Sequence, residues 1–171
     1  MNFSELAQTR YSVRKFLDKS IEQDVMDRIL TAGHVAPTGC NYQPQRIYVV
    51  TSPEKIALLN QIIKCIFGAK TVLIFTYNND EDWKNPLEDG VHSGVQDVSI
   101  VATHIMMQAW ELGVGSCWVN YFSPSRLEKE MGLPENEKAV LLMPMGYPAE
   151  DSQPLAMHGQ YRDISETVRY I

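Results

Sequence analysis

The longest stretch of helical periodicity, residues 89–112, constrains the fold of this chain more than any other feature. Apolar residues recur every three or four positions along it and predict a nearly continuous apolar inner face, formed by Val95, Val98, Val101, Ala102, Ile105 and Ala109. Gly113 follows and suits a helix end. A helix with so wide an apolar face has to pack against other elements, so we expect it at the core of the fold.

Short apolar segments predict a sheet beside this helix. They are rich in β-branched and aromatic residues, as strands are, and comprise residues 46–51, 71–77, 116–119 and 138–145. The segment TVLIFTY (71–77) is apolar enough to be a central strand. Pro144 suggests that the last segment is an edge strand or ends near that residue, because proline cannot donate to a sheet ladder.

Further helices are predicted between the strands. Ser20 and Gln23 have the spacing of a capping box, and Gly33 suits the end of that helix. Ser52 and Ser123, each followed by proline, mark two more helix starts. The expected helices cover residues 3–9, 20–32, 53–64, 89–112 and 124–131.

Composition limits the class of protein. A chain of 171 residues with 44% hydrophobic content suits a single domain, 1–171, and no internal repeat divides it. The formal net charge of −6 argues against a nucleic-acid or membrane surface, which needs a basic face. The chain has neither an apolar run long enough to span a bilayer nor an apolar signal core at its start, so we expect a cytoplasmic protein.

The cysteines and histidines predict no metal site. Cys40, Cys65 and Cys117 are odd in number and far apart in sequence, which suits reduced thiols. Cys117 lies in an apolar run and is expected to be a small core residue. The histidines show no spacing with carboxylates or cysteines that is typical of metal ligands.

The segment RYSVRKF, residues 10–16, is a candidate anion site. Arg10 and Arg14 share one face whether the segment is extended or helical, and Ser12 joins them if it is extended. Two guanidiniums offer several N–H donors to a phosphate without loss of charge at physiological pH. The alternative is a solvated basic turn.

A second candidate is the loop APTGCNYQPQR, residues 36–46. Its prolines fix the backbone, and Gly39 permits close approach of a flat ligand. Asn41 and Gln43 carry amides, which both donate and accept hydrogen bonds. The alternative is an ordinary connection between a helix and a strand.

Together these motifs resemble the flavin-dependent nitroreductase family. The family pattern is Arg-x-Ser-x-Arg/Lys, then Pro-Ser/Thr-x-x-Asn-x-Gln-Pro, and it is met here by Arg10, Ser12, Arg14, Pro37, Thr38, Asn41, Gln43 and Pro44. The resemblance continues through LGVGSCWVNYF and PMGYP and spans essentially the whole chain.

The resemblance implies an α+β fold, a three-layer α/β/α sandwich with a mixed, largely antiparallel central sheet. It also implies an intertwined homodimer with FMN at the subunit interface, and an irregular C-terminal tail (residues 148–171) that packs on the partner subunit. The residues implied to bind FMN are Arg10, Tyr11, Ser12, Arg14, Pro37, Thr38, Gly39, Asn41, Gln43, Trp118, Val119, Asn120, Tyr121 and Arg162.

Several roles follow from the resemblance alone. Arg10, Ser12 and Arg14 are expected to face the flavin, while the side chains of Tyr11, Val13 and Lys15 point away. The Pro37 loop is expected to contact the same flavin from the partner subunit. Backbone N–H groups of Asn120 and Tyr121 are expected near the flavin N5 and O4, where a donor stabilises developing negative charge.

Three positions depart from the pattern or match it weakly. Arg162 corresponds to a family residue that reaches the flavin phosphate, but its usual basic companion is replaced by Gln160. The side chains of Val119, Asn120 and Tyr121 stand where small or glycine residues are frequent, so they are expected to crowd the flavin face, and the size of the acceptor stays open. Gln61 and Lys64 correspond only weakly to a pair that touches the pyrimidine, and Lys64 is expected to face solvent.

The implied activity is reduction of a nitroaromatic, quinone or similar organic acceptor by NADH or NADPH, through ping-pong hydride transfer. No catalytic side chain is required, because the flavin carries the chemistry. Two alternatives remain at this point: an FMN-binding module without turnover, for storage or regulation, and a reductive dehalogenase-like or flavin-destroying relative.

Overall fold

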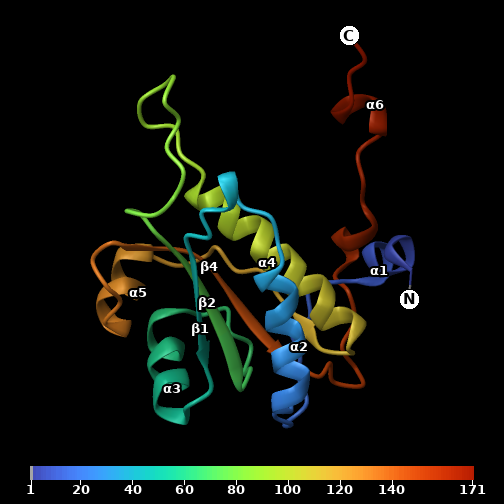
Figure 1. The fold of residues 1–171 in the computed structure, drawn as a ribbon. Coiled ribbons are helices and arrows are strands. Elements are labelled where there is room, and N and C mark those ends of the chain that lie inside the picture. The colour runs from blue at the N-terminus through green and yellow to red at the C-terminus, as the bar shows by residue number, and fades with distance from the viewer. Residues whose placement is uncertain (1) are drawn as a thin grey trace.

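A four-stranded sheet forms the middle layer of the computed structural model, which describes residues 2–171 (Figure 1). Its strands, in the spatial order β1-β2-β4-β3, are β1 (Gln45–Val50), β2 (Thr71–Asn78), β3 (Gly115–Ser116) and β4 (Glu137–Gly146). The helices are α1 (Phe3–Thr9), α2 (Gln23–His34), α3 (Pro53–Ile62), α4 (Gly94–Glu111), α5 (Pro124–Met131) and α6 (Ile164–Thr167), with short 3-10 turns η1 (Gly39–Asn41) and η2 (Ala156–Gly159).

The side chains of β2 divide the core into two layers, because successive residues of a strand point to opposite faces. Leu73, Phe75 and Tyr77 pack on the side of α2 and α4, whereas Val72 and Ile74 pack with Leu59 of α3 and Leu127 of α5. All three strand ladders are antiparallel, and a parallel bridge joins Ser12 to Ser116. The predicted α+β sandwich with a mixed, largely antiparallel sheet is therefore confirmed.

Helix α4 is the central helix that the sequence predicts, but it begins at Gly94 rather than near residue 89. Residues 79–93 form a hairpin that projects beyond the sheet (Figure 1), closed by a bridge between Lys84 and His92. Val95 was placed on the inner face and is instead 51% exposed. The rest of the predicted face is buried against α2 and the sheet.

The capping box predicted at Ser20 is wrong, since α2 begins at Gln23 with Glu22 as its N-cap and without a side-chain cap. Glu22 is held by other partners: Lys19 Nζ lies 2.8 Å from its Oε1, and the Tyr147 hydroxyl donates to its Oε2. These two hydrogen bonds lower the pKa of the Glu22 carboxyl from 4.5 to about 2. The carboxylate thus ties the start of α2 to the end of β4.

We expect the Glu22→Gln variant to lose stability only where this carboxylate is ionised. Because the pKa in the folded chain is about 2, the contribution is complete above the ordinary value of 4.5 and disappears as the pH falls toward 2. Thermal midpoints of both proteins, measured from neutral pH down to about pH 2, should converge at the acidic end. A difference that stays constant over that range would contradict the assignment.

Gly33 lies inside α2 rather than after its end, and its role is close packing. A Cβ at this position would stand 2.6 Å from Cδ1 of Ile105 and 3.3 Å from Val101 Cγ1 on α4. The two helices approach here because glycine has no side chain. The glycine that the sequence suggests as a helix end is therefore required by the packing of α2 on α4.

Strand β4 is an interior strand between β2 and β3, so the edge alternative for Pro144 is wrong. Pro144 lies near the end of β4, opposite Val72, and its carbonyl accepts from the Cys117 amide at 3.1 Å. The predicted strand 116–119 is reduced to β3 plus a single bridge between Val119 and Leu142. Proline is tolerated because the sheet is nearly at its end there.

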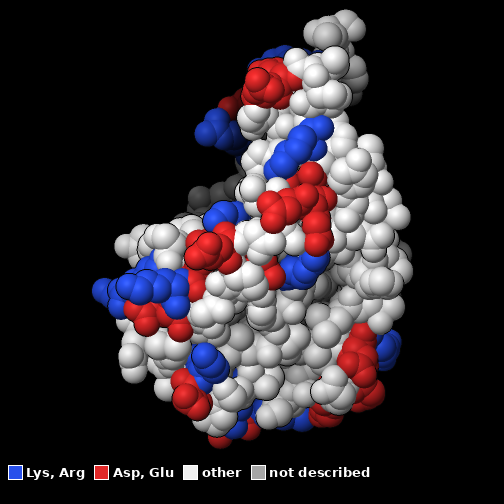
Figure 2. All heavy atoms as spheres, turned by 60° about the vertical axis from the view of Figure 1, so that its left-hand side comes forward, with Lys and Arg blue, Asp and Glu red and all other residues white. Residues whose placement is uncertain are grey.

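Charges of both signs are mixed on the surface. On the face drawn in Figure 2, Lys and Arg side chains alternate with Asp and Glu and form no uniform basic field. Among residues 2–171, no helix is long and apolar enough to cross a membrane.

Candidate functional site

The segment 10–16 is extended and lies beside the end of β4 and β3. The Val13 amide donates to the Ser116 carbonyl at 2.9 Å, and the Val13 side chain is fully buried against Gly115. Alternation along the extended backbone then turns Ser12 and Arg14 to the opposite side. Val13 is thus turned away from Ser12 and Arg14, whereas Tyr11, which was also expected to point away from the flavin, lines a cavity together with Ser12 and Arg14.

Arg10 and Arg14 form a half-buried pair of cations near Cys117. Burial raises the pKa of the Cys117 thiol, while the charge of Arg14, a hydrogen bond from Ser12 and the charge of Arg10 oppose that shift. Arg14 donates through Nη1 to the Ser12 carbonyl at 3.0 Å, and its guanidinium lies 5.9 Å from the centre of the Phe67 ring. In the described part of the chain neither arginine has a carboxylate partner.

These guanidiniums fit an anionic group. Partly buried charges are often paired, and among residues 2–171 no Asp or Glu pairs with either arginine, although the sequence carries 21 acidic residues. A cavity of about 110 Å³ opens beside Arg14 and is lined by Tyr11, Ser12, Arg14, Leu155, Met157 and His158. The phosphate of a cofactor such as FMN matches this donor set.

Tyr11 and Lys15 have partners outside this pair. The Tyr11 hydroxyl donates to the Ser152 carbonyl at 3.1 Å, and its ring packs edge-on against Trp110. Lys15 pairs with Asp151 at 2.5 Å on the surface. Both side chains therefore anchor the segment to neighbouring parts of the same chain.

The segment Trp118–Tyr121 continues from the same region and presents two free backbone donors. Val119 exchanges both backbone hydrogen bonds with Leu142, at 2.9 and 3.0 Å. Asn120 is fixed through its side chain, which accepts from the Trp118 indole and donates to the Val140 carbonyl at 3.0 Å. Within residues 2–171, the amide N–H groups of Asn120 and Tyr121 have no acceptor.

A second cavity, of about 300 Å³, lies beside these donors. It is lined by Ile62, Lys64, Asn120, Tyr121 and Phe122. Lys64 is exposed, as predicted, yet it also faces this cavity, whereas Gln61 is not among the lining residues. The Tyr121 side chain is 79% exposed and forms part of the wall.

The loop from Pro37 to Gln43 has a strained backbone. Cys40, Asn41 and Gln43 have φ angles of 48°, 58° and 52°, in the left-handed region that non-glycine residues rarely occupy. Such conformations persist where the surrounding structure enforces them, and they cluster at functional sites. Pro37, Asn41 and Gln43 are exposed, so this loop presents its side chains outward.

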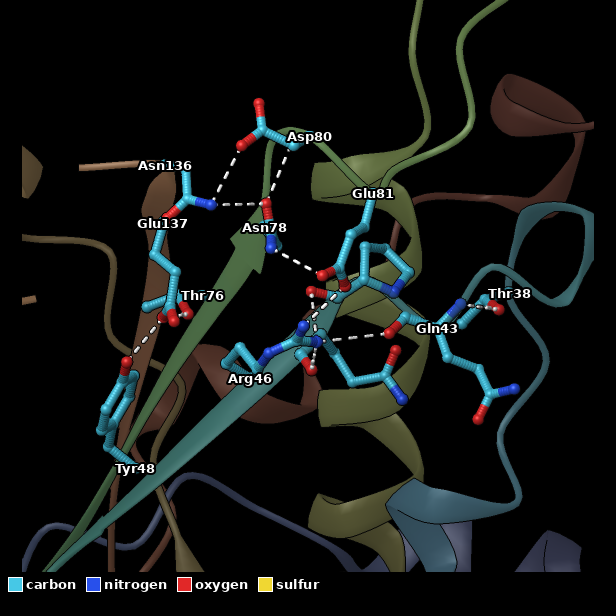
Figure 3. A network of polar contacts seen from close by, with 12 residues as sticks. Thr38, Gln43, Arg46, Tyr48, Thr76, Asn78, Asp80, Glu81, Asn136 and Glu137 are labelled. Atoms are coloured by element: carbon cyan, nitrogen blue, oxygen red, sulfur yellow. Dashed lines mark hydrogen bonds and ion pairs between the residues drawn. The ribbon is translucent and has the colours of Figure 1, made fainter. Parts of the chain in front are cut away.

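Both ends of this loop are fixed. The Gly39 amide donates to Oδ1 of Asp97, in the first turn of α4, at 2.8 Å, and the buried Asp97 also accepts from the Ser93 hydroxyl at 2.6 Å. The Gln43 amide donates to the Thr38 hydroxyl at 3.1 Å and closes the loop. At the other end Arg46 contacts the carbonyls that follow Gln43 (Figure 3).

Sequence reasoning overlooked Arg46 and Asp97. The sequence places Asp97 only within a helix, and Arg46 only at the junction of the candidate loop 36–46 and the following strand. Their residue types were the available signal. A carboxylate in the first turn of a helix can accept from backbone N–H groups, and an arginine at the start of a strand can donate to backbone carbonyls.

The predicted residues fall into two groups at opposite ends of α4. Arg10, Ser12 and Arg14 lie near Ser116 and Cys117, which follow the C-terminal end of the helix. Residues 118–121 lead away from there along β4, where Val119 bridges Leu142 and Asn120 donates to the Val140 carbonyl. The Pro37 loop is bonded to Asp97, in the first turn of α4. The 14 helical steps from Asp97 to Glu111 correspond to about 21 Å, so the arginine pair and the Pro37 loop lie near opposite ends of α4 within one chain.

The C-terminal tail leaves the domain after η2 and rises past it, ending at α6 and the C-terminus (Figure 1). Arg162 pairs with Glu166 at 3.3 Å and is largely exposed, and within the described chain it does not join Arg10 and Arg14. Large apolar side chains of the tail are also exposed, among them Met157, Tyr161, Ile164 and Tyr170. An apolar segment this open is typical of one that packs on another molecule.

Fold and site together define an α/β/α sandwich protein with an unpaired arginine cluster on one end and a strained, outward-facing loop on the other. The sequence model of the nitroreductase family matches residues 7–67 and 64–147. A nitroreductase family protein from Clostridium difficile 630 has the same fold with a TM-score of 0.92, at 36% identity over 99% of this chain and 98% of its own. This chain belongs to the nitroreductase family.

Two further relatives are similar over most of their length. An FMN-dependent nitroreductase from Clostridium difficile R20291 superposes with a TM-score of 0.75 at 25% identity, covering 96% of each chain. A protein of Methanothermobacter thermautotrophicus, provisionally named NADH dehydrogenase/NAD(P)H nitroreductase, is 28% identical over 158 residues, which are 88% of this chain and 80% of its own.

Proposed function

We propose that this chain is an NAD(P)H-dependent oxidoreductase that binds FMN between two copies and reduces nitroaromatic, quinone or similar organic acceptors. Family membership supports the reaction class, as do the names of its relatives, which include an FMN-dependent nitroreductase and an NAD(P)H nitroreductase. A homodimer of this kind carries two equivalent sites.

The observation that carries the proposal is the separation of the two halves of the site. The arginine pair and the Pro37 loop are about 21 Å apart along α4 in one chain, yet both have the features of a ligand site. A second copy related by twofold symmetry unites the arginine pair of one chain with the loop of the other. The exposed tail supports the same arrangement, because its apolar side chains require a partner.

Each group of residues has a distinct role in this arrangement. FMN, when bound, supplies the ring that takes hydride from NAD(P)H and passes it to the acceptor. Arg10 and Arg14 would hold its phosphate, with Arg14 oriented by the Ser12 carbonyl and the Phe67 ring. The free amides of Asn120 and Tyr121 offer two donors to a group that gains negative charge. Lys64 and Tyr121 limit the space that an acceptor can occupy beside them.

An anaerobic titration tests this function. The purified protein, loaded with FMN, is mixed with NADH or NADPH, and the flavin absorbance should bleach and return on addition of a nitroaromatic or a quinone. Bound flavin that neither nucleotide bleaches would instead favour a binding module without turnover. A protein that takes up no FMN would overturn both interpretations.

A further inference from the structure

Arg46 is the main side-chain contact of the strained loop on its strand side. Its Nη1 donates to three successive carbonyls, those of Gln43 at 3.5 Å, Pro44 at 3.4 Å and Gln45 at 3.0 Å (Figure 3). The planar guanidinium holds two donor nitrogens apart in a fixed fork, so that Nη1 faces these carbonyls while Nη2 faces Glu81, an arrangement that the single nitrogen of an ammonium group does not reproduce. Arg46 therefore holds the backbone of residues 43–45, which follow the left-handed residues Cys40 and Asn41 and include Gln43.

The guanidinium is itself held in place by the hairpin of residues 79–93. Its Nη2 lies 2.5 Å from Oε2 of Glu81, and Oε1 of Glu81 accepts from the Asn78 side chain at 2.8 Å. The backbone N–H of Asn78 donates to the Pro44 carbonyl at 2.8 Å, so Asn78 contacts both Glu81 and the strand side of the loop. Figure 3 shows the Glu81 carboxylate, from the turn that follows β2, between the side chains of Asn78 and Arg46.

This network contributes little to the stability of the fold as a whole. The side chains of Arg46 and Glu81 are 38% and 46% exposed, and exposed ion pairs have small effects on unfolding. The loop that Arg46 holds is nevertheless the one with three left-handed non-glycine residues. The contacts of Arg46 therefore set the local geometry of the loop.

We propose that Arg46 is a positioning residue of the flavin site, acting through the loop from Pro37 to Gln43 on the flavin bound to the arginines of the other copy. The proposal rests on the proposed function, since it requires FMN between two chains. It goes beyond that function by assigning a role to a residue of β1 whose own contacts are with the loop carbonyls and with Glu81.

The first test compares Arg46→Ala and Arg46→Lys with Arg126→Ala, which removes an exposed arginine on α5. Arg46→Ala should weaken FMN binding about tenfold and change the visible spectrum of the bound flavin, while the thermal midpoint of the FMN-free protein stays near that of the wild type. Arg46→Lys keeps the charge opposite Glu81 but not the fork, so it should recover part of the affinity. Arg126→Ala should bind FMN as the wild type does.

The second test uses mixed dimers. Arg14→Ala and Arg46→Ala chains, co-expressed with different affinity tags, should form dimers in which one site has an intact arginine pair and an intact loop. Each mixed dimer should bind one FMN tightly and show about half of the wild-type turnover, although both parent variants are defective.

The outcomes separate the two proposals. An unchanged FMN dissociation constant in Arg46→Ala would overturn the role of Arg46, as would mixed dimers that regain neither flavin nor turnover while the wild type binds two FMN. Failure of the wild type to bind FMN would overturn the proposed function, and the role of Arg46 with it.

Discussion

Replacing Arg14 with alanine should weaken FMN binding by about 1.5–3 kcal/mol, roughly tenfold to a hundredfold in the dissociation constant, because a charge-assisted hydrogen bond is lost. Arg14 is half-buried, has no carboxylate partner in the described chain, and is oriented by the Ser12 carbonyl. Replacing Arg14 therefore removes a hydrogen-bond donor for FMN and leaves no carboxylate of the described chain without its partner. The dissociation constant is measured by fluorescence quenching of FMN on titration with the FMN-free protein.

Two companions show whether the loss is specific. Arg14→Lys keeps the charge without the fork and should lose less affinity than Arg14→Ala, whereas Arg126→Ala on α5 should lose none. Equal FMN affinity in Arg14→Ala and the wild type would remove Arg14 from the site. It would leave the alternative of a solvated basic turn for residues 10–16.

Ending the chain after Ser152 should weaken the proposed dimer and shift the protein toward monomers. The deleted residues include Met157, Tyr161, Ile164 and Tyr170, whose side chains are 68%, 79%, 73% and 97% exposed in the single chain. Apolar side chains with so few contacts contribute little to the fold of their own chain, but they add a large area to an interface. Light scattering during size-exclusion chromatography measures the mass directly.

The truncation leaves the sheet and its covering helices intact, although it removes Leu155, Met157 and His158 from the wall of the cavity beside Arg14. Ser152 is retained because its carbonyl accepts from the Tyr11 hydroxyl. A Leu87→Ser variant is the matched control, since Leu87 is 92% exposed but belongs to the hairpin. A truncated chain that still has the mass of a dimer would show that the tail is not required for association.

The fold was largely predictable because its main signals are local. The apolar run of β2 and the periodicity of α4 come from residues that are adjacent in sequence, and both elements lie where those patterns indicate. The predictions were wrong where a residue far away in the sequence determines the local structure. Glu22 takes the place of Ser20 at the start of α2 because Tyr147 binds it, and Gly33 is needed by Ile105 rather than by a helix end.

The site was predictable in its residue types but not in its geometry. Alternation in RYSVRKF correctly separated Val13 from Ser12 and Arg14, because an extended backbone fixes that pattern. The left-handed backbone of the Pro37 loop could not be predicted from the local sequence. It depends on Asp97 and Arg46, and the register that brings Arg46 opposite Thr76 is a property of the assembled sheet.

The distance between the arginine pair and the Pro37 loop along α4 has a thermodynamic consequence. If one flavin contacts both, association of the chains and uptake of FMN are linked equilibria, and each strengthens the other by the same factor. The apparent FMN affinity should then rise with protein concentration until the dimer is saturated. Dilution alone would release the cofactor, so the cellular abundance of the chain would set the fraction that carries flavin.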